Sequence, residues 1–185
     1  MKKEQVLSIK YEACRIGVEP EALAAFVSVE SGGSGFNNDG KLIIQFEPSY
    51  FYKRTNVMIN NGVSWQAVEW KAFNEAFRIN TNAAMESTSI GLGQVMGAHW
   101  KRLGYSSVGE MWDDAKKGED RQIYQMAEFI RTDARLIKAL KEKNWHLVAT
   151  YYNGAGYLNL AKKYGREPYN ISMKKAYDKY KIQGL

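Results

Sequence analysis

The chain has 185 residues, 45% of them hydrophobic and 25% charged, which is typical of a globular protein with a hydrophobic core. Its single cysteine, Cys14, excludes an intramolecular disulfide and cannot form a metal site by itself. The net charge of +6 suits any anionic polymer, either nucleic acid or a cell-wall glycan with its peptide carboxylates. The 20 acidic residues argue against nucleic acid as the partner.

Neither a signal peptide nor a membrane span is predicted. The N-terminal MKKEQVLSIKYEA has no long apolar region after its lysines, and no run approaches the roughly 18 apolar residues of a span. We therefore expect the protein to accumulate in the cytoplasm without stable insertion into a membrane. We also expect a monomer.

Two helices are predicted at the start of the chain. The first covers residues 3–16 with an apolar stripe on one face, and Gly17 ends it. Cys14 is expected to be buried among the apolar side chains of this helix. The second helix begins at Pro20, because proline is well tolerated in the first turn of a helix.

A carboxyl group is predicted on the apolar face of the second helix. In residues 23–33 (LAAFVSVESGG), Leu23, Phe26 and Val27 form a buried stripe that continues to Glu30, where two glycines end the helix. Burial disfavours the ionised form and raises the pKa of a carboxyl group, as a general acid near neutral pH requires. This stretch alone is equally compatible with a Glu30 that points into water.

A tight turn, a short strand and a third helix are predicted next. Residues 37–40 (NNDG) favour a turn because Asn, Asp and Gly accept positive φ angles. Residues 42–47 (LIIQFE) form the only convincing strand, closed by Pro48, so any sheet is expected to be a hairpin. The helix is predicted to begin at Ser64. Its expected buried face consists of Trp70, Phe73 and Phe77.

The remaining chain is predicted to be mostly helical. Residues 80–104 interrupt the helical pattern with small residues and glycines. Helices then follow at 107–117, about 119–142 and 145–152, with two shorter ones before the end. We therefore predict a mainly α protein, a helical bundle with one small β-hairpin, in a single domain over residues 1–185.

Four polar clusters interrupt the core pattern at element boundaries, where sites on rigid scaffolds are often built. They are Glu30 with Ser31, residues 39–47, residues 87–94 (STSIGLGQ) and residues 151–154 (YYNG). The Glu-Ser pair, the Ser-x-Gly-Leu-Gly-Gln-Val-Met segment and the late Tyr-Asn-Gly-Ala-Gly segment resemble the signature of soluble lytic transglycosylases and goose-type lysozymes. With Phe46-Glu47 included, the pattern is more similar to the N-acetylmuramidase family of phage endolysins, over nearly the whole chain.

The resemblance implies a lysozyme-like fold and cleavage of the β-1,4 bond between N-acetylmuramic acid and N-acetylglucosamine in peptidoglycan. Glu30 would protonate the glycosidic oxygen. Gln94 and the glycine-rich loop would bind the sugar, since glycines let a ligand approach the backbone closely. Tyr151 or Tyr152 would line the cleft, and Asn153 would orient the sugar or the loop. Ordinary alternatives are core packing for the tyrosines and a helix cap for Asn153.

Other residues of these motifs are also expected at the substrate. Ser31 and Ser89 are two of them. Most glycosidases pair their acid with a second carboxylate, whose separation from the acid decides between inversion and retention. Glu47 is the first candidate, followed by Asp39 and then Glu86. If none serves, Glu30 acts alone as in the lytic transglycosylases, and the product carries a 1,6-anhydro end.

A non-catalytic glycan-binding or phage structural module is the alternative outside enzymes. No metal or nucleotide cofactor is expected. His99 and His146 are far apart and lack carboxylate or thiol neighbours, and the GLGQ segment is neither preceded by a strand nor followed by Lys-Ser/Thr. The expected partner is bacterial peptidoglycan in the cell wall (periplasm), which the enzyme would reach when a membrane lesion releases it from the cytoplasm.

Overall fold

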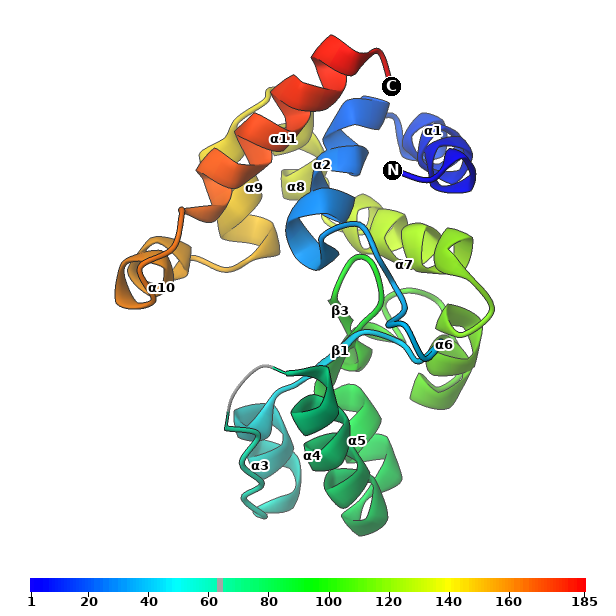
Figure 1. Cartoon of the computed structure of the whole chain (residues 1–185), viewed down its shortest axis with the longest axis vertical. Helices are drawn as coiled ribbons and strands as arrows, with labels where there is room; N and C mark the ends of the chain where they lie inside the picture. The colour runs from blue at the N-terminus through cyan, green and yellow to red at the C-terminus, as the bar shows by residue number, and fades with distance from the viewer. Residues whose placement is uncertain (63–64) are drawn as a thin grey trace. The chain divides into compact units, whose positions relative to one another are not determined.

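The computed structural model describes residues 1–62 and 65–185, and it is mainly helical with one small sheet (Figure 1). The described backbone divides into two compact units: unit 1 is Met1–Gly33 with Ala127–Leu185, and unit 2 is Ser34–Met126. The predicted mainly α class is confirmed, and the single domain stays a prediction. No helix in the described ranges has the length and apolar character needed to cross a membrane.

Unit 1 is helical throughout, and α2 lies at its centre. Its helices are α1 (Lys3–Ile16), α2 (Pro20–Ser31), the end of α7 (Glu119–Arg131), α8 (Ala134–Lys141), α9 (Trp145–Tyr152), α10 (Tyr157–Lys163) and α11 (Tyr169–Gln183). Both α1 and α11 pack against α2, and α9 packs against α8 and α11. The side chains from Ala22 to Val27 are all buried, because this helix has neighbours on several faces.

The first helix has the predicted bounds, and Ile9, Ala13 and Ile16 of its apolar stripe are buried, but two polar residues are buried beside them. Gln5 and Glu12 are buried: Gln5 donates a hydrogen bond to the carbonyl of Gly33 (2.9 Å), just after α2, and Glu12 pairs with Arg15 (2.6 Å). The prediction that Cys14 is buried is wrong, since its side chain is exposed on the opposite face of α1. The apolar stripe alone could not show which of its flanking residues turn inward.

The single helix predicted over residues 119–142 is wrong, because α7 and α8 are separate. Between them, the side chain of Asp133 accepts a hydrogen bond from the N–H of Arg135 (3.0 Å) and caps α8. The buried face also shifts at this point, so that Leu136 is buried whereas Ala134 is exposed.

Unit 2 is built around a three-stranded antiparallel sheet in the order β1-β2-β3. The strands are β1 (Ile44–Phe46), β2 (Thr88–Ile90) and β3 (Val95–Met96), with Ile44 opposite Ile90 and Ser89 opposite Met96. The predicted lone hairpin is thus extended: the turn at residues 37–40 forms, but β1 pairs with the segment that contains the glycine-rich motif. That motif therefore does follow a strand, contrary to expectation.

Short helices surround this sheet. They are α3 (Pro48–Thr55), α4 (Gln66–Ile79), α5 (Thr81–Glu86), the 3-10 helix η1 (Gly97–His99), α6 (Val108–Ala115) and most of α7. The predicted start at Ser64 lies outside the described residues. Trp70 and Phe73 pack with Trp112, whose ring is stacked 4.8 Å from that of Phe73, but Phe77 is 40% exposed, so its predicted burial is wrong. Helices α3 and α5 were not predicted.

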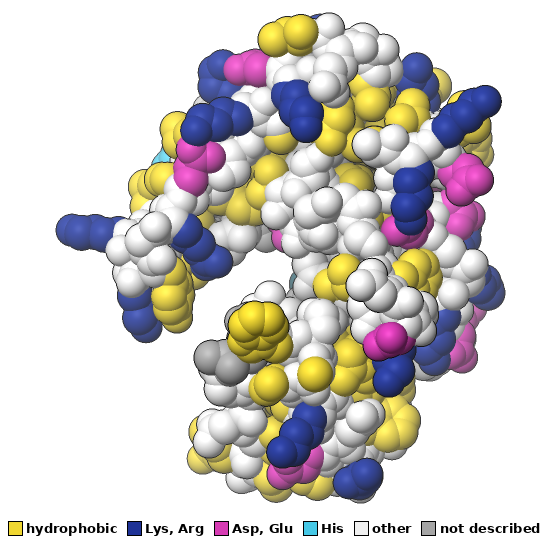
Figure 2. Space-filling view, viewed as in Figure 1, with side chains coloured by type: hydrophobic (Ala, Val, Ile, Leu, Met, Phe, Trp, Pro, Cys, Tyr) yellow, Lys and Arg dark blue, Asp and Glu magenta, His cyan; other side chains and the backbone are white. Residues whose placement is uncertain are grey.

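Charged side chains are scattered over the exterior. In Figure 2, the Lys and Arg side chains on the face in view are dispersed and do not gather into one patch. Several of them pair with carboxylates, for example Lys143 with Glu19 (2.6 Å) and Lys117 with Asp114 (3.1 Å).

Candidate active site

Glu30 lies in the last turn of α2, one residue before the helix ends at Ser31. The apolar stripe of this helix packs into unit 1, and Phe26, one turn earlier on the same face, is fully buried. Gly32 follows with a φ of 64°, a left-handed conformation that glycine adopts without strain, and its N–H bonds to the carbonyl of Ser28 (3.2 Å). The position of Glu30 is therefore set by an ordinary glycine-terminated helix.

Aromatic residues from three helices surround this carboxyl group. The hydroxyl of Tyr169, in the first turn of α11, donates a hydrogen bond to Oε1 of Glu30. The ring of Tyr152, at the end of α9, stacks on that of Tyr169 (6.4 Å between centroids) and contacts Phe26 (4.5 Å). Phe129 of α7 packs edge-on against Tyr152 (5.3 Å). Glu30 is half-buried, so it does not simply extend into water.

These surroundings determine the protonation state of Glu30. Loss of hydration raises its pKa from 4.5 to about 7, and the hydrogen bond from Tyr169 offsets only part of that rise. Burial, together with the negative charge of Glu30, holds the pKa of both Tyr152 and Tyr169 well above the usual value. The tyrosines therefore remain neutral at physiological pH, while the carboxyl group is close to half protonated.

Glu47, the predicted second carboxylate, belongs to unit 2. It follows β1 and precedes the first turn of α3, and its N–H extends the β1-β2 ladder by bonding to the carbonyl of Ser87 (2.8 Å). Its carboxylate accepts a hydrogen bond from Nε2 of Gln45 (2.9 Å). Partial burial and the neighbouring charge of Glu69 raise the pKa of Glu47, and the bond from Gln45 opposes the rise.

Ser89 lies in β2 directly opposite Gln45 of β1, so the two side chains share one face of the sheet. Because side chains alternate along a strand, Glu47 lies on the same face as Gln45. The hydroxyl of Ser87, which follows α5, is buried and has no hydrogen-bond partner within the described chain. The predicted residues Glu47 and Ser89 are therefore brought to one polar face of the sheet.

Gln94 closes the turn between β2 and β3. Its backbone has a φ of 45°, and its Nε2 donates to the carbonyls of Gly91 (2.8 Å) and Ile43 (3.4 Å). The amide nitrogen thus holds the glycine-rich loop against the segment that precedes β1. Binding of sugar by Gln94 stays a prediction, and only its amide oxygen remains available for it.

The glycines of this loop are required for packing against α7. A Cβ atom on Gly93 would lie 2.6 Å from Cβ of Met126, and one on Gly91 would lie 2.7 Å from the side-chain amide of Gln122. That amide is buried, where it accepts a hydrogen bond from the N–H of Leu92 (2.9 Å). These two glycines therefore make room for α7, and the predicted approach of a sugar to the loop backbone stays a prediction.

Three predicted binding residues of unit 1 have structural surroundings that do not depend on a substrate. The hydroxyl of Ser31 donates to the carbonyl of Val27 (3.1 Å) within α2. The ring of Tyr151 lies 4.8 Å from the guanidinium of Arg135. Asn153 is the C-cap of α9, with an exposed side chain. Their contacts with substrate stay predictions, and of the two tyrosines it is Tyr152 that approaches Glu30.

The lower-ranked acidic candidates have other roles. Glu86 accepts hydrogen bonds from Trp100 (3.0 Å) and Arg54 (3.0 Å), one at each carboxylate oxygen, so it joins η1 to α3. Asp39 is exposed at the tip of the turn, where its N–H bonds to the side chain of Asn37 (3.0 Å).

The two histidines differ in their surroundings. Burial and the charge of Arg102 lower the pKa of His99 to about 4. His146 is exposed, and its Nδ1 shares a hydrogen bond with Tyr157 (2.7 Å). In the described part of the chain, no group of three His, Cys, Asp or Glu residues could hold a metal ion.

The sequence interpretation missed Tyr169. This residue follows Pro168 at the start of α11 and is 139 positions from the carboxyl group that it contacts. A proline before an aromatic residue marks a helix start but says nothing about its partner. The sequence could have placed Tyr169 at the site only if the pairing of α11 with α2 had been known.

A helix-end carboxyl group with a raised pKa in a mainly helical protein is compatible with the class of acid-catalysed glycoside hydrolases. Comparison with known proteins identifies the group within this class. Residues 19–181 match the N-acetylmuramidase family, and the chain belongs to that family. It is a lysozyme-type glycoside hydrolase that acts on peptidoglycan, and the family resemblance seen in the motifs is confirmed.

The fold supports the same assignment. The chain is similar to the crystal structure of the Burkholderia AP3 phage endolysin, with 28% sequence identity and a TM-score of 0.82. The similarity covers 97% of this chain and 71% of that one. No curated protein matches the sequence.

Proposed function

We propose that Glu30 is the general acid of this muramidase. The observation that carries the proposal is its position: the carboxyl group is half-buried at the end of α2 and bonded to Tyr169. The loss of hydration there raises its pKa to about 7, so that it can hold a proton near neutral pH. The proton passes from Glu30 to the glycosidic oxygen while the bond from that oxygen to the anomeric carbon breaks. The leaving sugar departs as an alcohol, and positive charge develops on the other ring.

Tyr169 supports this step as a positioning residue. When Glu30 gives up its proton, the carboxylate that remains accepts the hydrogen bond from the Tyr169 hydroxyl. A hydrogen bond to a charged acceptor is stronger than one to a neutral acceptor, so this contact strengthens as the charge develops. Tyr152 keeps the Tyr169 ring in place through stacking.

We further propose that Glu47 is the second carboxylate, either as a base that activates water or as a nucleophile. Partial burial and the charge of Glu69 raise its pKa, whereas the bond from Gln45 opposes that rise and fixes one of its oxygens. Among the sugar-binding residues, we infer that Gln94 acts through its amide oxygen, since its nitrogen is bonded to backbone carbonyls.

The test compares wild-type enzyme with Glu30→Gln on purified peptidoglycan and determines the masses of the products. Loss of a general acid lowers rates by about 10²–10⁴-fold, whereas Glu110→Gln, a change at an exposed carboxylate, leaves the rate unchanged. Full activity in Glu30→Gln would contradict the proposal. Glu47 is supported as the second carboxylate if Glu47→Gln loses activity and the wild-type products are hydrated. Full activity of Glu47→Gln would assign that role to another residue.

We also propose that the protein acts as an endolysin, supported by its similarity to the phage endolysin structure. Expression inside bacterial cells is then expected to leave the cells intact until the inner membrane is permeabilised, after which turbidity falls. The Glu30→Gln variant is the control, since it should produce no fall in turbidity after the same treatment.

A further inference from the structure

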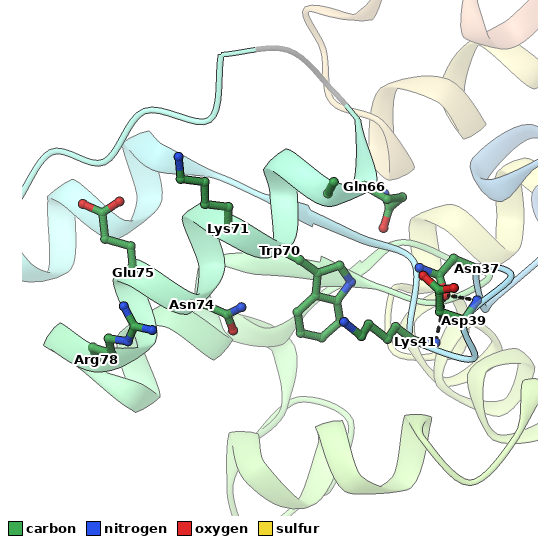
Figure 3. Close-up of a pocket in the computed structure, with 10 residues that line it drawn as sticks. Asn37, Asp39, Lys41, Gln66, Trp70, Lys71, Asn74, Glu75 and Arg78 are labelled. Atoms are coloured by element: carbon green, nitrogen blue, oxygen red, sulfur yellow. Dashed lines mark hydrogen bonds between the residues drawn. The ribbon is translucent and has the colours of Figure 1, made fainter.

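A groove of about 600 Å³ lies in unit 2, between α4 and the turn at residues 37–41 (Figure 3). Along α4, Lys71, Asn74, Glu75 and Arg78 line it at intervals of three and four residues, which places them on adjoining faces of one helix. In Figure 3, Lys41 is directed from the turn toward Trp70 of α4. The groove does not include Glu30 or Glu47.

Of the three amide side chains that line this groove, Gln66 and Asn37 already have partners, whereas Asn74 on α4 is exposed. Gln66 accepts from the N–H of Ile44 (3.0 Å) and donates to its carbonyl (2.8 Å), so both ends of its amide are engaged. The side-chain oxygen of Asn37 accepts two backbone N–H groups of its own turn. The amide of Gln66 and the amide oxygen of Asn37 therefore hold the protein together and are not available to recognise sugar hydroxyls.

The side chain of Trp70 also has partners within the protein. Its indole N–H donates to the carbonyl of Leu42 (3.1 Å), and its ring packs edge-on against Phe73 (5.4 Å). The ring can still offer part of its surface, since Trp70 is half-buried. Trp70 therefore offers a ligand only part of its ring, and its polar N–H group is not available.

The charged groups, in contrast, remain available. Lys41, Lys71 and Arg78 supply three cations, and Asp39 and Glu75 supply two carboxylates. All five are exposed, and none has an ion-pair or hydrogen-bonded side-chain partner among residues 1–62 and 65–185. Charges of both signs along one groove are complementary to a ligand that itself carries carboxylates and an ammonium group.

From this groove we infer a binding site for the stem peptide of peptidoglycan. The inference rests on the proposed function, because it names a second part of the same substrate. In peptidoglycan, the charged groups are in the peptides, as free carboxylates and the amine of the dibasic residue. The glycan itself is neutral at the sugars to which a peptide is attached. The cations of the groove would bind the carboxylates, and Asp39 or Glu75 would bind the amine.

The length of the groove agrees with a short peptide. From residue 67 to residue 78, α4 rises by about 16 Å at about 1.5 Å per residue. An extended peptide advances by about 3.3–3.6 Å per residue, so this face accommodates roughly five residues.

The experiment compares two forms of one peptidoglycan preparation, intact or with its peptides removed by an amidase. The variant combines Lys71→Glu with Arg78→Glu, and the matched control combines Lys10→Glu with Lys101→Glu, which makes the same change in net charge at exposed positions elsewhere. We expect the groove variant to lose about tenfold in kcat/KM on intact peptidoglycan relative to the control, and to equal it on the peptide-free glycan.

The outcomes separate the two proposals. Equal losses on both substrates, or no loss on either, would overturn the stem-peptide site while leaving the muramidase proposal intact. If wild type cleaves neither substrate, the proposed function fails, and a binding experiment then tests the groove.

For that experiment, a synthetic stem tetrapeptide is titrated into ¹⁵N-labelled Glu30→Gln protein. Shifts confined to residues 37–41 and α4 support the site, and their absence at millimolar peptide overturns it. Unchanged melting temperatures of both double variants exclude misfolding as the cause.

Discussion

The raised pKa of Glu30 makes the stability of the folded chain depend on pH, with a sign opposite to that of a salt-bridged carboxylate. The folded state holds the proton up to about pH 7, whereas an unfolded chain releases it near pH 4.5. Between these values the folded state binds more protons, so stability falls as pH rises. The stabilising contribution is fully present below pH 4.5 and is lost above about pH 7.

The size of this effect follows from the shift. Each pKa unit corresponds to about 1.4 kcal/mol, so the rise from 4.5 to about 7 is equivalent to about 3 kcal/mol. Glutamine imitates the protonated acid and does not titrate. The Glu30→Gln variant is therefore expected to match wild type at pH 4 and to exceed its free energy of unfolding by about 3 kcal/mol at pH 8. For a chain of this length, that difference raises the melting temperature by about 6–12 °C.

Urea unfolding followed by circular dichroism at four pH values between 4 and 8 measures this difference. Subtracting wild type from variant at each pH cancels the titration of the other carboxylates. The control is Glu110→Gln, since hydrogen bonds from Ser106 lower the pKa of exposed Glu110, and this variant should gain no stability as pH rises. A difference between Glu30→Gln and wild type that stays constant with pH, or is largest at pH 4, would refute the reasoning.

Three further predictions concern the site, the glycine loop and the net charge. Tyr169→Phe removes a hydrogen bond that lowers the pKa of Glu30, so the alkaline limb of the kcat/KM profile should move to higher pH; an unchanged limb would contradict the contact. Gly93→Ala should destabilise the fold by about 1–3 kcal/mol in urea because of Met126, while Gly156→Ala, with open space around it, should be nearly neutral. Turbidity assays should show wall lysis slowing as salt screens the +6 charge, and a flat salt response would remove charge from the explanation.

The parts of the fold that were predictable are those encoded by neighbouring residues. The bounds of α1, the start of α2 at Pro20 and the position of Glu30 all follow from helical spacing and from proline and glycine at helix ends. The capped start of α6 at Ser107 is of the same kind. In each case the physical cause lies within a few residues of its effect.

The parts that were missed depend on distant contacts. Strands β2 and β3 have only three and two residues, too few for an alternating pattern, and they exist because β1 pairs with them. Tyr169 stands in a segment of mixed basic and aromatic residues that reads as a solvated helix. Its role depends on α11 packing against α2. The glycines of the loop were noticed in the sequence. Their close packing against side chains of α7 could not be predicted from the residues next to them in the sequence.

A comparison of Glu30 with Asp114 explains why burial alone does not make an acid catalyst. Asp114 is only 5% exposed, and burial opposes its ionisation, yet hydrogen bonds from Arg121, Tyr105 and Lys117 lower its pKa below the usual value. Glu30 accepts a hydrogen bond from a neutral tyrosine and has no ion pair in the described chain, so desolvation prevails and its pKa rises. A cationic partner would stabilise the fold but would keep the carboxyl group ionised at neutral pH. Desolvation of Glu30 therefore both raises its pKa to a value that suits proton donation and lowers the stability of the fold when the carboxyl group is ionised. For this reason, Glu30→Gln should lower activity and, at neutral to alkaline pH, raise stability.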